Sequence, residues 1–396
     1  MFDLPPVIPV RRDLVIDVIR ALCIIEMSLN HVSRGSLVDR LTHRLPWFDG
    51  ASGFVLMSGL VLGMVQANRI ARAGMASATL TVLKRAGLLY VAHVALVMLA
   101  LSVGSLFPSS LPRFAELGGM GMGTLQVMLL QVNPRFLDIL SMYVVLLLAA
   151  VAASWLLKHN QLVLLLAAMT AAYGIGERFP QAMTLPRSGG ITAFFNLGAW
   201  QLLFLSAFIV GWYWQQRELS RLLSSRMSAL LATTALLALW AFGHIGPSVL
   251  TGAAEAAAFQ TLFAKDTIGI GRILMAWIVF GLLYYSLSKL AQRVAAKWLA
   301  PMAALGRRSL DCFVILSLVT ITMFALSENG WDWKWISDWV AAALALLLML
   351  LWARLRDARQ AAKPPRNQAL AGARSLSGGA RWVRYIWRRN APQGNW

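Results

Sequence analysis

Long apolar segments recur along this chain and constrain its fold more than any other feature. Most approach the ~20 residues that an α-helix needs to cross the hydrocarbon core of a bilayer. Ten such segments are expected to span, at 14–33, 51–67, 86–106, 136–157, 161–176, 196–214, 227–243, 267–287, 308–326 and 338–354. The apolar segment 119–131 is shorter and predicts a re-entrant or interfacial helix.

Composition supports the same conclusion. Hydrophobic residues make up 58% of the 396 residues and charged residues only 13%, against about 45–50% and about 25% in soluble domains. So few charged residues exclude a soluble globular enzyme and a disordered chain. We therefore expect an all-α, polytopic membrane helix bundle of about ten transmembrane helices, with one domain over 1–354.

The positive charge predicts the orientation. The formal net charge is +19, and Lys and Arg concentrate in the loops that face the cytoplasm if the N-terminus does. Cytoplasmic loops of membrane proteins carry this excess. Both termini are therefore expected in the cytoplasm. The charge is assigned to topology, and no nucleic-acid partner is expected.

Residues 355–396 differ from the rest of the chain. Pro364-Pro365 and the Ser/Gly residues near 375–379 predict a flexible tail. Basic residues interleaved with Trp and Tyr at 381–389 suit an anionic membrane surface, although a solvated tail or a nucleic-acid-binding tail would share this composition. Cys23 and Cys312 form no disulfide or metal-binding pattern, and no metal is expected.

The first segment holds the candidate chemistry. Ionisable residues within a membrane are costly and mark functional sites, and this segment contains Asp17, Arg20, Glu26 and His31. On a helix, Arg20 and His31 lie about 20° apart around the axis and about 16 Å apart along it. This geometry suits a long ligand whose anionic end is held inside and whose reactive end lies outside. His31 is the candidate base, with a capping or pore-lining histidine as the alternative. Glu26 points away and is expected to contact a neighbouring helix.

These residues resemble a known family. Arg20, ten residues and His31 match the arginine–histidine motif in the first span of acyltransferase-3 membrane proteins. The surrounding sequence is similar to the OpgC branch, the succinyltransferases of osmoregulated periplasmic glucans. Further similar motifs follow in order at 12–22, 54–59, 84–93, 137–143, 195–204 and 305–310. The chain departs from the branch at Asn30 and Ser52, where acidic residues are usual, and at Ser141, where proline is usual.

The resemblance implies an O-acyltransferase of the bacterial inner membrane. Acyl-CoA, with succinyl-CoA as the expected donor, would be a co-substrate, and no permanently bound cofactor is expected. The acceptor would be a hydroxyl of a periplasmic glucan or related glycan. Membrane lipid is a further partner, and the oligomeric state stays open. A transporter or flippase without catalysis is the alternative function, and a non-catalytic partner in glycan export is a third.

Several other residues are candidates for the site, each with a structural alternative. Asp138 is expected to orient His31 or hold a sugar hydroxyl, or else to be a carboxylate favoured at a helix N-terminus. Lys84 and Arg85 would bind coenzyme A phosphates with Arg20, or anchor the topology. Tyr143 and the patch of Asn196, Trp200 and Gln201 would bind the acceptor, the patch having an aromatic belt as its alternative.

Two further residues depend on unknown partners. Arg272 lies within an apolar segment and needs a buried partner, either Asp138 or the carboxylate of the acyl group. His93 is expected to form a hydrogen bond between packed helices.

Overall fold

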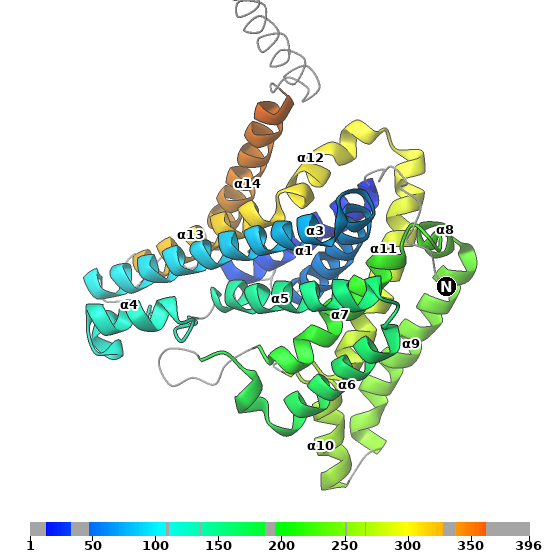
Figure 1. The fold of residues 1–396 in the computed structure, drawn as a ribbon, viewed down its shortest axis with the longest axis horizontal. Coiled ribbons are helices and arrows are strands. Elements are labelled where there is room, and N and C mark those ends of the chain that lie inside the picture. The colour runs from blue at the N-terminus through cyan, green and yellow to red at the C-terminus, as the bar shows by residue number, and fades with distance from the viewer. Residues whose placement is uncertain are drawn as a thin grey trace, which may run out of the picture. The chain divides into compact units, whose positions relative to one another are not determined.

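The part of the protein that the structure describes is built of helices, as the sequence pattern predicts (Figure 1). The computed structural model describes residues 13–32, 47–107, 111–134, 136–186, 195–249, 252–265, 267–327 and 337–361. Its helices are α1 (Leu14–Val32), α3 (Gly50–Leu106), α4 (Met120–Met128), α5 (Asp138–Lys158), α6 (Leu162–Arg178), α7 (Leu197–Tyr213), α8 (Leu219–Leu223), α9 (Arg226–Val249), α10 (Ala253–Leu262), α11 (Ile270–Arg293), α12 (Ala296–Arg307), α13 (Ser309–Ser327) and α14 (Ser337–Ala361). Two short 3-10 turns lie at Phe114–Leu117 and Pro180–Met183.

All-helical architecture is confirmed. In the part of the chain that the structure describes, β pairing is limited to one isolated bridge between Thr184 and Asn196. The short helix predicted at 119–131 is α4. The sequence pattern missed α8, α10 and α12, because each is too short to stand out as a span.

Two compact units divide the chain, Met1–Leu350 and Leu351–Trp396. The bundle of the first unit is described below. Of the predicted tail, 355–361 continues α14, and 362–396 lies outside the described residues.

A glycine divides α3 into two arms. Gly74 has φ 77° and ψ 170°, far from helical values, inside an otherwise helical run of 57 residues. Across this bend Gln66 Nε2 donates to Ala78 O at 3.4 Å, and Arg69 donates to Thr81 Oγ1. These contacts join residues that a straight helix would hold about 18 Å apart. The two arms therefore correspond to the predicted spans 51–67 and 86–106.

Among the residues that the structure describes, five helices are long and apolar enough to cross a membrane, with α3 counted once: Gly50–Leu106, Asp138–Lys158, Arg226–Ile245, Ile270–Arg293 and Ser309–Leu326. Helix α7 is apolar but shorter. The first helix has the length, but Asp17, Arg20 and Glu26 interrupt its apolar sequence. The bundle is that of a membrane protein; the number of ten spans and the cytoplasmic position of both termini stay predictions.

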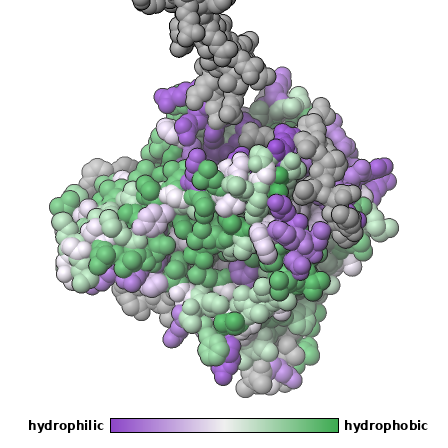
Figure 2. Space-filling view, viewed as in Figure 1, coloured by the Kyte–Doolittle hydropathy of each residue, from purple (hydrophilic) through white to green (hydrophobic). Residues whose placement is uncertain are grey.

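The surface of the bundle is widely apolar (Figure 2). Large side chains that are half or more exposed stand on α3, α5 and α6, at Leu88, Val91, Trp155, Val163 and Leu164. On the visible face apolar side chains cover most of the middle. A surface of this kind is suited to lipid, because a soluble protein rarely exposes such continuous apolar area.

The first arm of α3 packs against α7 through glycines. A Cβ added to Gly59 would lie 2.1 Å from Phe204 O, and one on Gly63 would lie 2.1 Å from Phe208 O. From the other side, a Cβ on Gly211 would lie 2.0 Å from Leu60 O. Small residues four apart let membrane helices approach at backbone distance. This contact fixes the position of α3 within the bundle.

Substituting Gly63 by Ala should lower the stability of the bundle. The added methyl group meets backbone atoms that cannot move aside, and overpacking of this kind costs about 1–3 kcal/mol. Gly87 in the second arm has open space around its Cα, so Gly87→Ala is the matched control and should be neutral or stabilising. Thermal unfolding of the detergent-solubilised variants measures both; an equal melting temperature for Gly63→Ala and wild type would contradict the packing.

Candidate functional site

Arg20 is buried in α1 and reaches the start of α13. Its guanidinium Nη2 donates to Ser309 Oγ, and only 8% of the residue is exposed. The last turn of α12, just before Ser309, packs closely on α1, because a Cβ on Gly306 would lie 1.7 Å from Asp17 O. The motif at 305–310 therefore meets the arginine of the first helix, although they are far apart in sequence.

A buried tyrosine links this arginine to α3. The hydroxyl of Tyr143 has Ser58 beside it and lies within electrostatic range of both Arg20 and Arg85. The tyrosine ring packs edge-on against Phe54 and Phe204, with centroids 5.5 and 6.3 Å away. Arg85 is half-buried, whereas Lys84 is exposed. Arg20 of α1 and Arg85 of α3 thus both lie within electrostatic range of Tyr143 of α5, and Lys84 lies at the surface.

His31 ends α1 beside two phenylalanines. The rings of His31 and Phe136 meet edge-on with centroids 4.8 Å apart, and Phe136 stacks on Phe324 of α13 at 5.4 Å. Asp138 begins α5 two residues after Phe136 and is 8% exposed. Because α1 is one continuous helix, Arg20 and His31 share a face as predicted. The roles of His31 and Asp138 stay predictions.

His93 forms the predicted contact between packed segments. It is fully buried in α3, and its Nδ1 bonds the carbonyl oxygen of Leu137 at 3.2 Å. The carbonyl can only accept, so Nδ1 carries the proton and donates. His93 therefore connects the second arm of α3 to the segment that precedes α5.

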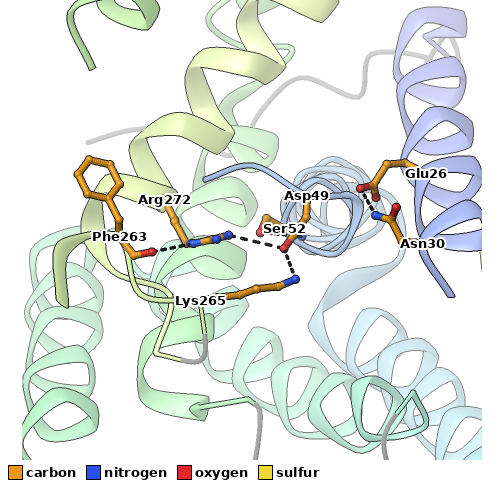
Figure 3. Close-up of polar contacts among 7 residues, drawn as sticks. All are labelled: Glu26, Asn30, Asp49, Ser52, Phe263, Lys265 and Arg272. Carbon is orange, nitrogen blue, oxygen red and sulfur yellow. Dashed lines mark hydrogen bonds and ion pairs between the residues drawn. The ribbon is translucent and has the colours of Figure 1, made fainter. Parts of the chain in front are cut away.

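Arg272 has a buried carboxylate partner, and the partner is Asp49 rather than Asp138 (Figure 3). Arg272 Nη1 lies 3.6 Å from Asp49 Oδ2, and Lys265 Nζ lies 3.1 Å from the same oxygen. Arg272 Nε also donates to Phe263 O at 2.9 Å. Two cations thus converge on one carboxylate oxygen.

Asp49 also caps the N-terminus of α3. Its Oδ1 accepts hydrogen bonds from Ser52 N at 2.9 Å and from Ser52 Oγ at 2.7 Å. A carboxylate therefore lies against Ser52. The sequence analysis missed Asp49 and Lys265. An Asp immediately before an apolar run is a helix N-cap signal, and it could have identified Asp49; nothing in the sequence marked Lys265.

Glu26 contacts a neighbouring helix, as predicted. A Cβ added to Gly50 of α3 would lie only 1.8 Å from Glu26 Oε2, so the carboxylate lies directly against this glycine. The carboxylate also accepts a hydrogen bond from Asn30 (Figure 3). Two carboxylates, Glu26 and Asp49, thus lie at the N-terminus of α3, where the helix dipole favours negative charge.

The residues of α7 that were predicted to bind the acceptor form contacts within the bundle. Asn196 caps α7 by accepting from Ala199 N at 3.1 Å, and it donates to Gly176 O of α6 at 2.7 Å. Gln201 donates to Met169 O of α6 at 2.8 Å. Trp200 is 1% exposed and packs edge-on against Phe195. Asn196 and Gln201 hold α7 on α6, Trp200 packs on Phe195 just before the α7 cap, and the role of all three toward a ligand stays a prediction.

These observations define a class: a helical membrane protein with a buried arginine and a distal histidine on one face of its first helix. The comparison with protein families gives the family. The family described as OpgC protein matches residues 12–361, which is most of the chain, and the protein therefore belongs to the OpgC family. This membership implies a transferase role in glucan modification. No curated protein and no solved structure matches the chain significantly.

Acidification should weaken the cluster at Asp49. Burial acts to raise the pKa of this carboxyl, but Lys265, the two Ser52 hydrogen bonds and Arg272 outweigh burial and lower it. A carboxyl whose pKa is lower in the folded than in the unfolded chain adds stability above the unfolded value, about 3.9, and this stability is lost as the pH falls through the folded pKa. Thermal unfolding of wild type and Asp49→Asn in detergent should therefore differ most at neutral pH. A difference that grows on acidification would contradict the assignment.

Proposed function

We propose that the protein is an integral-membrane O-acyltransferase. It moves an acyl group, succinyl in our proposal, from cytoplasmic acyl-CoA to a hydroxyl of a periplasmic glucan. The observation that carries the proposal is the continuous helix α1, which joins a buried cationic cluster at Arg20 to His31 in a protein of the OpgC family. A transporter or flippase would not need a base at the end of this path.

The cluster around Arg20 suits the anionic donor. Arg20, which is buried, and Arg85, which is half-buried, both lie within electrostatic range of the Tyr143 hydroxyl, which supports a shared role toward an anionic ligand. Guanidinium binds phosphate through paired hydrogen bonds. Lys84, which is exposed one residue before Arg85, would meet the donor first. The acyl-pantetheine arm then follows α1 over the about 16 Å that separate Arg20 from His31.

His31 supplies the base in this proposal. A sugar hydroxyl is a weak nucleophile until its proton is removed. His31 accepts that proton, the hydroxyl oxygen bonds to the thioester carbonyl carbon, and the C–S bond breaks. Coenzyme A leaves as a thiolate and takes up the proton that His31 releases. Asp138, two residues from the ring that contacts His31, would orient the base or hold a sugar hydroxyl.

The cluster at Asp49 suits the free carboxylate of a dicarboxylic acyl group. Arg272 and Lys265 converge on one oxygen of Asp49, which supports a proposed site for an anionic oxygen at this end of α3. Lys265 is 44% exposed and is therefore accessible to a second carboxylate. Tyr143 stays a proposed ligand of the substrates. Asn196, Trp200 and Gln201 would act on the acceptor indirectly, by fixing the start of α7.

His31→Ala should lower acyl transfer by about 10²-fold or more, since a positioned base contributes about 10²–10⁴-fold. His31→Gln should not restore it, because an amide cannot accept a full proton near neutral pH. The assay uses purified protein in liposomes with succinyl-CoA on one side and glucan on the other, and mass spectrometry measures the acylated glucan.

His159→Ala is the matched control for His31. This histidine is exposed at the end of α5 and bonds its own helix at Trp155 O, so its loss should leave transfer unchanged. Normal transfer by His31→Ala would place the base elsewhere. Glucan movement without cleavage of the thioester in wild-type protein would favour the transporter.

Arg85→Ala should raise the KM for acyl-CoA by about 10–100-fold, the equivalent of ~1.5–3 kcal/mol for a charged hydrogen bond. Arg85→Lys should recover part of the loss, because an ammonium lacks the paired donors of guanidinium. Arg221→Ala removes an exposed charge that is paired with Glu218 and serves as control. An unchanged KM in both Arg85 variants would leave Arg85 as a topological anchor.

A further inference from the structure

Phe136 has an unfavourable backbone conformation beside His31. Its φ is 78°, in the left-handed region that a bulky residue rarely adopts. Such conformations persist only where the surrounding structure enforces them, and they concentrate at functional sites. The position therefore needs a physical explanation.

Two buried side chains hold the segment that carries Phe136. His93 Nδ1 donates to Leu137 O at 3.2 Å, and Asn133 Nδ2 donates to Leu130 O at 2.7 Å. The backbone N–H groups of Leu137 and Asp138 both donate to Pro134 O, at 3.1 and 3.2 Å. His93 and Asn133 are at most 1% exposed. The segment is thus fixed on both sides of Phe136.

This conformation places the Phe136 ring between two other rings. One neighbour is His31, at 4.8 Å with an interplanar angle of 75°, and the other is Phe324, at 5.4 Å and 28°. The three residues come from α1, from the segment before α5 and from α13. Each of them is half-buried, so the rings line a surface rather than fill the core.

We infer that Phe136 is a positioning residue that orients the His31 imidazole and excludes water from the thioester. The inference rests on the proposed function. Edge-to-face contact restricts rotation of the imidazole. The stacked rings of Phe136 and Phe324 offer no polar atom that could hold water beside the imidazole. Bound donor would therefore react with a glucan hydroxyl in preference to water.

The two outcomes differ only in the nucleophile. In transfer, a glucan oxygen bonds to the carbonyl carbon, the C–S bond breaks, and the products are acylated glucan and coenzyme A thiol. In hydrolysis, water supplies the oxygen and the proton, and the products are free acid and coenzyme A thiol. The ratio of acylated glucan to released thiol therefore measures how well water is excluded.

Phe136→Gly is the most informative variant. Glycine adopts φ 78° without strain, so this change removes the ring while keeping the backbone conformation. We expect transfer to fall by about 10-fold or more, since small misplacements near the reacting atoms have effects of that size. The ratio of acylated glucan to released coenzyme A thiol should also fall, because more of the donor is hydrolysed. The melting temperature should stay near that of wild type. Phe136→Leu should restore part of this ratio, because it returns an apolar side chain.

Asn160→Gly is the matched control. Asn160, which follows α5 and is exposed, also has a positive φ, 58°, so glycine relieves the same kind of strain away from the ring contact with His31. Its ratio of transfer to hydrolysis should equal that of wild type. A wild-type ratio and rate in Phe136→Gly would overturn the inference and leave the proposed function intact. An equal loss of transfer and hydrolysis, with lower stability, would reduce Phe136 to a structural role. If the wild type neither acylated glucan nor released coenzyme A thiol, the inference and the proposed function would both be overturned.

Discussion

The cost of placing charge within a membrane dominates the organisation of this protein. A charged residue in a transmembrane segment is expensive unless it meets a partner or a polar cavity. Arg20 meets Ser309 of α13 and lies near Tyr143 of α5, and Arg272 meets Asp49 at the start of α3. Each contact joins helices that are distant in sequence. The charges of the candidate site therefore also determine which helices pack together.

Close backbone contact makes these polar contacts possible. Gly59, Gly63 and Gly211 bring α3 and α7 together, and Gly306 brings the end of α12 onto α1. Helices in a membrane gain little from hydrophobic association and depend on such close packing. The first arm of α3 is held in this way, so Ser58 and the Asp49 cap are fixed relative to α7.

Backbone strain gathers at the ends of the helices that carry the site. Trp47 and Ile268 have φ of 61° and 40° and flank Asp49 and Lys265 in sequence, and Phe136 has φ 78° beside His31. The Trp47 ring is fixed against Gly243, where an added Cβ would lie 1.5 Å from it. Strain held by packing is consistent with a site that is preorganised before substrate binds.

The sequence by itself determined the long apolar helices, because apolar length and composition are local properties; even the two spans that form α3 were visible from 51–67 and 86–106. It also determined the shared face of Arg20 and His31, which follows from helical periodicity. The partners of Arg272, the contact between Arg20 and Ser309, and the ring of Phe136 on His31 depend on which helices meet. The tertiary structure alone decided these, because contacts between distant segments leave no periodic signal in the chain.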